Sequence, residues 1–100
     1  MKQNLSHKDI IRLLRVEKKF LKDEFGVLNI GLFGSYVKGT QRLDSDIDLI
    51  VELKEPRFDW LSGLQIFLEQ KFGKKIELVR KSDNVNRRFT QRIGSEVIYV

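Results

Sequence analysis

Asp46 and Asp48 stand at the start of an otherwise largely apolar run that ends at Leu53. If this run is extended, alternation places both aspartates on one face and lets their carboxylates converge. At a separation of about 5 Å and an effective dielectric of about 20, their mutual repulsion amounts to about 3 kcal/mol. The pair therefore needs either open solvent or a compensating cation. Hard oxygen ligands favour Mg²⁺ or Mn²⁺, whose remaining ligands include substrate phosphates.

The surroundings of the two aspartates favour a cation site over a solvated strand face. The apolar residues Ile47, Leu49 and Ile50 indicate a core strand, and a polar pair at one end of such a strand usually serves a site. The chain has no cysteine and a single histidine, which disfavours zinc.

Gly34 and Ser35 precede Asp46 by ten intervening residues after the serine. A glycine at the end of a buried strand permits close backbone approach, and the following serine offers a hydroxyl and an amide to a phosphate oxygen. Alone, the dipeptide is an ordinary turn. Combined with the two carboxylates, it predicts a triphosphate site with metals on one side and phosphate donors on the other.

The elements that must position these residues follow from hydrophobic spacing. Ser6 and Asp9 resemble a helix cap, and Gly26 is a natural helix end. The apolar stripe of this first helix consists of Ile10, Leu13, Leu14, Phe20, Leu21 and Phe25. The segment Val27–Phe33 follows as a buried strand, with Leu28, Ile30 and Leu32 expected on one side.

The rest of the chain alternates between strands and helices. A polar loop leads to the strand Asp46–Leu53, whose core face carries Ile47, Leu49, Val51 and Leu53. The later elements are a helix over Trp60–Phe72 ended by Gly73, a strand over Lys75–Val79, a helix over Asn84–Ile93 and a strand over Val97–Val100. This order predicts an α/β (α+β) fold in which helices pack against a small mixed β-sheet.

The composition fits one small domain over residues 1–100. The net charge of +5 favours phosphate-bearing or acidic partners, although a solvated basic surface explains it equally. A basic cluster could bind RNA or an acidic protein face, or form the polar side of a helix, so nucleic-acid binding stays open; it comprises Arg80, Lys81, Arg87, Arg88 and Arg92. No apolar run approaches the roughly 20 residues that span a membrane, and we expect a cytoplasmic protein.

The segment GLFGSYVKGTQRLDSDIDLIVEL resembles the signature of the DNA polymerase β-type nucleotidyltransferases, which is Gly-Ser, ten residues and then Asp-x-Asp. Residues 34–39 are similar to the family's G-S-x-x-[RK]-G extension. The later stretches KKIELVRKS and IGSEVIYV are similar to the minimal nucleotidyltransferases, or MNT proteins, so the resemblance covers nearly the whole chain.

The resemblance implies a role for each matched residue. Gly34 and Ser35 contact the phosphates of the nucleotide, and Asp46 and Asp48 hold the metals. The family's third carboxylate is commonly an aspartate, and here that position is Glu77. The longer glutamate side chain displaces the carboxylate, and catalysis tolerates misplacement poorly. Glu77 is either the third catalytic carboxylate and metal ligand or a surface residue that alternates with buried neighbours.

Three further polar residues lie near these motifs in the sequence. Lys38 and Arg42 are candidate nucleotide-binding residues that could meet triphosphate oxygens, or they are simply solvated. Glu52 shares a strand face with Asp48 but lies about 13 Å further along the strand, so we interpret it as structural.

The resemblance implies an enzyme that transfers a nucleoside monophosphate, AMP from ATP, to a hydroxyl acceptor. MNT proteins typically accompany HEPN-domain toxins and adenylylate a tyrosine of the toxin, so the implied role is that of an antitoxin with Mg²⁺ or Mn²⁺ and ATP. The alternative is a catalytically weak or inactive MNT-fold module that neutralises its partner by contact, and the glutamate at position 77 keeps it open. An aminoglycoside-modifying or RNA-tailing enzyme would need further domains.

Overall fold

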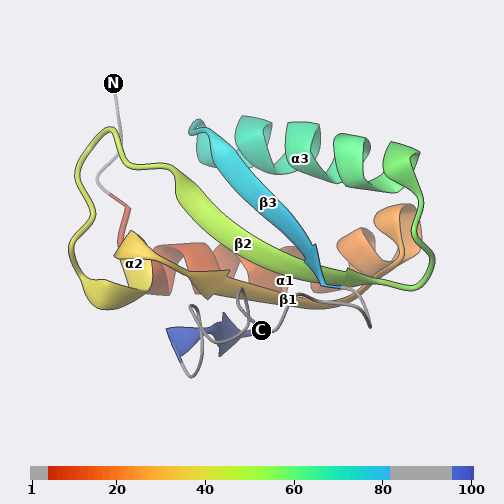
Figure 1. Ribbon diagram of the computed structural model, residues 1–100, viewed down its shortest axis with the longest axis horizontal. Helices are drawn as coiled ribbons and strands as arrows, with labels where there is room; N and C mark the ends of the chain where they lie inside the picture. Colours follow the sequence, from red (N-terminus) through yellow and green to blue (C-terminus); the bar gives the residue numbers. More distant parts are fainter. Residues whose placement is uncertain (1–4, 82–95) are drawn as a thin grey trace.

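The computed structural model of the protein describes residues 5–81 and 96–100 (Figure 1). The elements in chain order are α1 (His7–Phe25), β1 (Val27–Phe33), α2 (Ser35–Lys38), β2 (Ile47–Leu53), α3 (Phe58–Phe72), β3 (Ile76–Lys81) and β4 (Ile98–Tyr99). They match the predicted order within a few residues at each boundary, and α2 is a helical turn inside the predicted loop. The helix predicted over 84–93 lies outside the described residues.

The sheet has four strands in the order β3-β2-β1-β4. Strand β1 pairs antiparallel with β2 and with β4, whereas β2 and β3 run parallel, so the sheet is mixed as predicted. Helices α1 and α3 lie behind this sheet in Figure 1. The core joins both helices to the sheet and includes Ile10, Leu14, Leu21, Ile30, Leu32, Ile47, Leu49, Val51, Leu64 and Leu68. The opposite face of β2 is left to Asp48 and Glu52 with the buried Ile50.

The first helix begins and ends where its sequence predicts. The Ser6 hydroxyl accepts the Asp9 N–H at 3.3 Å, and the Asp9 carboxylate accepts the Ser6 N–H at 3.0 Å, which forms a capping box. Gly26 ends the helix in the left-handed conformation with φ of 62°. Phe20 belongs to the predicted apolar stripe but is 42% exposed and contacts the rings of Phe25 and Phe67.

The predicted alternation of buried and exposed side chains was wrong at the start of β1. Leu28 is 45% exposed, whereas Val27 is only 5% exposed and belongs to the core. The pairing register of β1 with β2 shifts between Val27 and Asn29. A bulge of this kind inserts one extra residue and reverses the facing of the side chains before it. From Ile30 onward the expected pattern resumes.

The start of β3 is bonded both to α3 and to the start of β2. Gln65 donates its side-chain N–H to the Ile76 carbonyl at 3.1 Å, and the Ile76 N–H is donated to the Glu69 carboxylate at 3.1 Å. The Ile47 N–H in turn reaches the Lys75 carbonyl at 3.0 Å. These bonds fix which residues of the two strands stand side by side. Within the described residues, none of the helices is both long and apolar enough to cross a membrane.

Candidate active site

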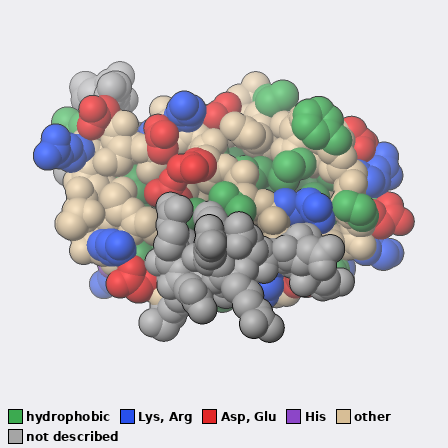
Figure 2. Space-filling view, viewed as in Figure 1, with side chains coloured by type: hydrophobic (Ala, Val, Ile, Leu, Met, Phe, Trp, Pro, Cys, Tyr) green, Lys and Arg blue, Asp and Glu red, His purple; other side chains and the backbone are tan. Residues whose placement is uncertain are grey.

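The two central strands bring Asp48 and Glu77 together. In the parallel register of β2 and β3, Asp48 pairs with Glu77 while the core residue Ile47 pairs with Ile76. Paired residues of neighbouring strands share a face, so both carboxylates lie on the side away from the helices. Figure 2 shows acidic side chains gathered on this side, over the starts of β2 and β3. From the sequence, Glu77 was either a metal ligand or a surface residue. The register of β2 with β3 places it beside Asp48.

The carboxylates form one electrostatic unit. Burial, hydrogen bonding to Glu77 and the negative charges of Glu77 and Asp46 raise the pKa of Asp48 to about 7. A carboxyl group with this pKa is protonated in a large share of the molecules at neutral pH, and a bound cation can take the place of the proton. No three carboxylates, histidines or cysteines of the described residues already form a metal-holding group. The carboxylates of Asp46, Asp48 and Glu77 are therefore neighbours, but they would have to move closer together to hold one cation.

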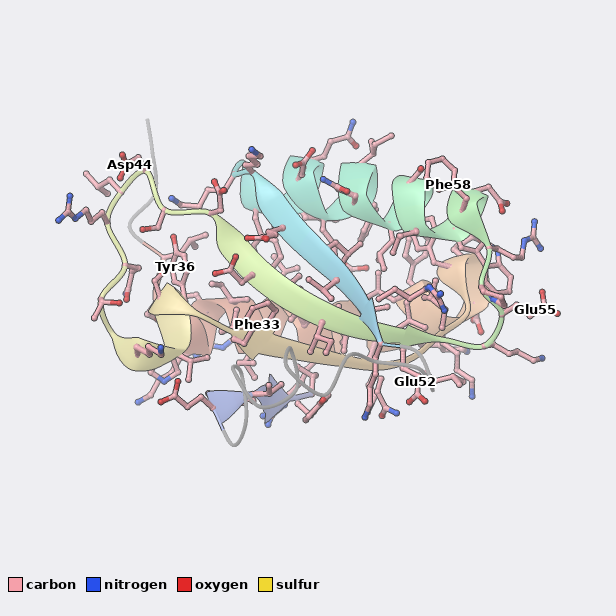
Figure 3. The ribbon with its side chains drawn as sticks, viewed as in Figure 1. Phe33, Tyr36, Asp44, Glu52, Glu55 and Phe58 are labelled. Atoms are coloured by element: carbon pink, nitrogen blue, oxygen red, sulfur yellow. The ribbon has the colours of Figure 1, made fainter. Side chains whose placement is uncertain are left out.

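Gly34 brings the Gly-Ser turn directly against Asp48. Its backbone adopts φ 78° and ψ −149°, a region open essentially only to glycine. A Cβ atom built on Gly34 would collide with the Asp48 carboxylate and lie 3.0 Å from its Cγ. Phe33, the preceding residue, pairs with Asp48 across β1 and β2, and Figure 3 shows it next to α2. The Gly-Ser and Asp-x-Asp motifs thus meet in space.

The turn after Gly34 is helical where the sequence predicted only a loop. The Val37 and Lys38 N–H groups donate to the Gly34 carbonyl at 3.1 Å, and Gly39 ends the turn with φ of 75°. Tyr36 anchors it in the core with 1% of its surface exposed. Spacing of apolar residues cannot reveal so short a helix because one turn contains no repeat. The first N–H groups of a helix have no acceptor within it, which leaves donors at Ser35.

Lys38, Arg42 and Glu52 are not brought to the carboxylates. The Lys38 ammonium lies 3.5 Å from the Glu96 carboxylate, and the Arg42 side chain is exposed on the loop. Over residues 5–81 and 96–100, no hydrogen bond or ion pair links either cation to Asp48. Glu52 accepts a 2.6 Å hydrogen bond from the Asn29 amide and lies toward the other end of β2 from Tyr36, as expected for a structural residue (Figure 3).

The nucleotidyltransferase domain family matches residues 14–99. This chain belongs to that family. Its relatives include the protein adenylyltransferase MntA of Thermococcus cleftensis, which is 37% identical over 97 residues that cover 96% of this chain and 97% of the relative.

Solved structures agree with this nucleotidyltransferase fold. A minimal nucleotidyltransferase superposes with a TM-score of 0.75 at 26% identity and covers 96% of this chain and 97% of its own. A toxin–antitoxin crystal structure with AMP-PNP superposes with a TM-score of 0.67 at 27% identity, covering 95% of this chain and 72% of that one. The small mixed sheet with packed helices is therefore the fold of minimal nucleotidyltransferases.

A cavity of about 550 Å³ lies beside the carboxylates of this nucleotidyltransferase. Its walls are the loop 43–46 and the segment 70–75 at the end of α3, so it includes Asp46 but neither Asp48 nor Glu77. Lys74 crosses between the two walls and donates to the Leu43 carbonyl at 2.5 Å. Sequence reasoning missed Lys74 because a lysine pair after a glycine reads as a solvated helix end, and only the fold brings it to a loop 31 residues away.

Substituting Gly34 with alanine is expected to destabilise the nucleotidyltransferase by about 1–3 kcal/mol and to displace the Asp48 carboxylate, because the new Cβ meets both a forbidden backbone region and that carboxylate. Gly39→Ala is the matched control. Gly39 also has a positive φ, of 75°, but a Cβ there has no neighbouring atom within 4 Å. Urea denaturation of both variants measures the difference, and equal losses would show that Asp48 does not press on Gly34.

Substituting Asp48 with asparagine is expected to stabilise the nucleotidyltransferase at pH 8 in EDTA. The folded-state pKa of about 7 lies above the ordinary 3.8, so the folded protein binds more protons than the unfolded chain between about pH 4 and 7. Stability falls as pH rises through this window, and asparagine removes that loss. Allowing for solvent access, we expect a gain of about 1–2 kcal/mol at pH 8 and little gain at pH 4.5. Urea denaturation at both pH values measures it, and equal gains would contradict the raised pKa.

Proposed function

We propose that this nucleotidyltransferase is a metal-dependent protein adenylyltransferase that transfers AMP from ATP to a tyrosine hydroxyl of a HEPN-domain toxin and thereby acts as its antitoxin. The observation that carries the proposal is the meeting of Gly34 with the carboxylate of Asp48, beside Glu77. The 37% identity to MntA, a protein adenylyltransferase, supports the reaction class, and the AMP-PNP of the similar toxin–antitoxin structure supports ATP as the donor.

The donors at the site fit a divalent cation. Asp46, Asp48 and Glu77 offer only hard carboxylate oxygens, which suit Mg²⁺ or Mn²⁺. Burial and the neighbouring negative charges raise the pKa of Asp48 to about 7, and a bound cation would offset both costs. When bound, the metal neutralises charge on the triphosphate and lowers the pKa of the acceptor hydroxyl. In this proposal Asp46 and Asp48 hold it and Glu77 completes the set.

The residues of the chain bind and orient the two substrates. Gly34 lets the triphosphate approach the backbone closely, while the hydroxyl and N–H of Ser35 donate to its oxygens. Glu77 lies at the exposed side of the cluster and orients the acceptor hydroxyl. The acceptor oxygen then attacks the α-phosphorus in line and loses its proton to solvent. The bond from this phosphorus to the bridging oxygen breaks, and pyrophosphate leaves.

Lys38 and Arg42 contribute to triphosphate binding only after a side-chain rearrangement. Lys38 has to leave Glu96, and both of these side chains are about half exposed at 55% and 52%. An exposed ion pair of this kind contributes at most about 1 kcal/mol, so an incoming phosphate competes with it easily. Arg42 is exposed on the loop that leads to Asp46, and in this proposal its side chain rotates toward the triphosphate. We propose that this chemistry takes place in the cytoplasm.

A second candidate function is a module that neutralises its partner by contact alone. The glutamate at position 77 and the lack of a preassembled three-carboxylate group in the described residues favour it. Two aspartates, a Gly-Ser turn and a raised pKa at Asp48 have no use in a pure binding module, whereas all of them serve nucleotidyl transfer. The adenylyltransferase therefore ranks first.

The deciding experiment incubates the protein with ATP labelled on the α-phosphate, Mg²⁺ and a co-purified HEPN-domain partner. Wild type is compared with an Asp46→Asn, Asp48→Asn double variant, with Asp44→Asn as the control for a neighbouring carboxylate. We expect label on the partner with wild type and with the control, and none with the double variant or with EDTA. Equal neutralisation of the partner by wild type and the double variant, without label transfer, would establish the binding module instead.

A further inference from the structure

Lys74 makes contacts that distinguish it from the other lysines around the cavity. Its ammonium donates to the Leu43 carbonyl at 2.5 Å and lies 3.5 Å from the Ser45 carbonyl. It also lies 5.9 Å from the centroid of the Tyr36 ring, within the range of a cation–π interaction. A lysine that donates hydrogen bonds to two backbone carbonyls and faces an aromatic ring is not a freely solvated side chain.

These contacts join the three segments that carry the proposed site. Leu43 and Ser45 belong to the loop that leads directly into Asp46, and Tyr36 follows Ser35 in α2. Lys74 itself stands in the turn between α3 and β3, three positions before Glu77. One ammonium therefore connects the phosphate-binding turn, the approach to the aspartates and the strand of the third carboxylate.

The loop depends on Lys74 because its other hydrogen bonds are local. The Ser45 N–H donates to the Arg42 carbonyl at 3.0 Å, and the Arg42 N–H donates to the Ser45 hydroxyl at 2.8 Å. Within the described part of the chain, the hydrogen bonds that enter residues 41–45 from other segments all come from Lys74. The Leu43 side chain is 55% exposed, so it adds little packing. Lys74 is thus the source of the loop's hydrogen bonds to other segments of the described chain.

The neighbouring lysines provide the comparison. Lys75 is exposed, and its side chain makes no hydrogen bond or ion pair with the described residues, although its backbone carbonyl accepts the Ile47 N–H. Lys71 lies 3.7 Å from the Glu17 carboxylate on α1, away from the loop. Only Lys74 of these three lysines lining the cavity bonds to the loop 43–46.

We propose that Lys74 is a positioning residue for nucleotidyl transfer: its ammonium ties the loop 43–45 to the start of β3 and lies over the Tyr36 ring of α2, so that Asp46 is presented to the cation held with Asp48. The inference rests on the proposed function and deepens it by naming what assembles the incomplete carboxylate group. Loss of the ammonium should loosen the loop, weaken divalent-cation binding and lower kcat, while the KM for the protein partner changes little. Groups that orient metal ligands in this way typically contribute about 10-fold to 100-fold to metal affinity or activity.

The test compares Lys74→Met with Lys75→Met, which removes the adjacent, unengaged ammonium. The first readout is hydrogen–deuterium exchange, in which we expect amides of residues 43–46 to exchange about 10-fold faster in Lys74→Met while α1 is unchanged. The second is a titration with Mn²⁺ followed by electron paramagnetic resonance, in which half-saturation should require about 10-fold more Mn²⁺. Neither readout requires catalysis, and Lys75→Met should match wild type in both.

The outcomes separate this inference from the proposed function. If Lys74→Met matches Lys75→Met in exchange and in Mn²⁺ binding, the inference is overturned. If both readouts change but wild type transfers no AMP, the positioning role stands and the proposed reaction fails. If Lys74→Met does not fold, Lys74→Gln replaces it in the test, because glutamine keeps a hydrogen-bond donor without the positive charge. Its exchange and Mn²⁺ half-saturation should then lie between wild type and a Lys74→Ala variant, and wild-type values would overturn the inference.

Discussion

Replacing Asp48 with asparagine should lower the rate of AMP transfer by about 100-fold to 1,000-fold, the range seen when one group that stabilises transition-state charge is removed. Asp48 stands at the centre of the site, beside Glu77 in the register and against Gly34. Asparagine keeps the volume and one oxygen but cannot carry the negative charge that a divalent cation requires. The rate is measured with α-labelled ATP at saturating Mg²⁺ and partner.

The same substitution separates chemistry from folding. Because ionised Asp48 is destabilised by burial and by its acidic neighbours, Asp48→Asn is expected to make the fold more stable while it strongly lowers the transfer rate. Asp44→Asn is the control, since the Asp44 side chain is exposed at the outer end of the loop and makes no hydrogen bond or ion pair with the described residues (Figure 3). It should transfer AMP at the wild-type rate. Full activity of Asp48→Asn would remove the metal-assisted mechanism from this site.

The parts of the fold that depend on local pattern were predictable from the sequence. The capping box at Ser6 and Asp9 and the left-handed glycines that end α1 and α3 are short-range features that depend little on the rest of the fold. The alternation along β2 was predictable for the same reason, because a period of two is fixed by the backbone. The meeting of Gly34 with Asp48 followed from the resemblance and the spacing together.

The features that depend on pairing between distant segments were not predictable. Leu28 is exposed because a bulge shifts the register of β1 against β2, and no residue type in the sequence indicates this bulge. The position of Glu77 beside Asp48 required knowing that β2 and β3 are parallel neighbours in a given register. Lys74 contacts the loop before Asp46 only because the fold brings that loop to the end of α3. The candidate residues were therefore predictable from the sequence, and their arrangement depends on the topology.

Replacing Glu77 with glutamine should lower AMP transfer by about 100-fold, whereas Glu77→Asp should retain much of the activity, since aspartate is the residue that the resemblance assigns to this position. Glu77 shares a hydrogen bond with Asp48 and helps to raise its pKa. Glutamine removes one negative charge from the cluster, so the pKa of Asp48 should fall. Transfer of α-labelled ATP measures the first effect, and carboxyl NMR titration of Asp48 measures the second.

Glu52→Gln is the matched control, because Glu52 lies on the same face of β2 but bonds to Asn29 at the other end of the strand. It should leave both the transfer rate and the pKa of Asp48 unchanged. If Glu77→Gln lowers the pKa but transfers AMP at the wild-type rate, Glu77 is a neighbour of the site and not a ligand, and two aspartates must hold the cation alone. If it changes neither, Glu77 is a surface residue of β3. A loss of transfer with Glu77→Gln, reversed in Glu77→Asp, would instead show that the longer side chain performs the task of the family's aspartate, because β3 sets its carboxylate next to Asp48.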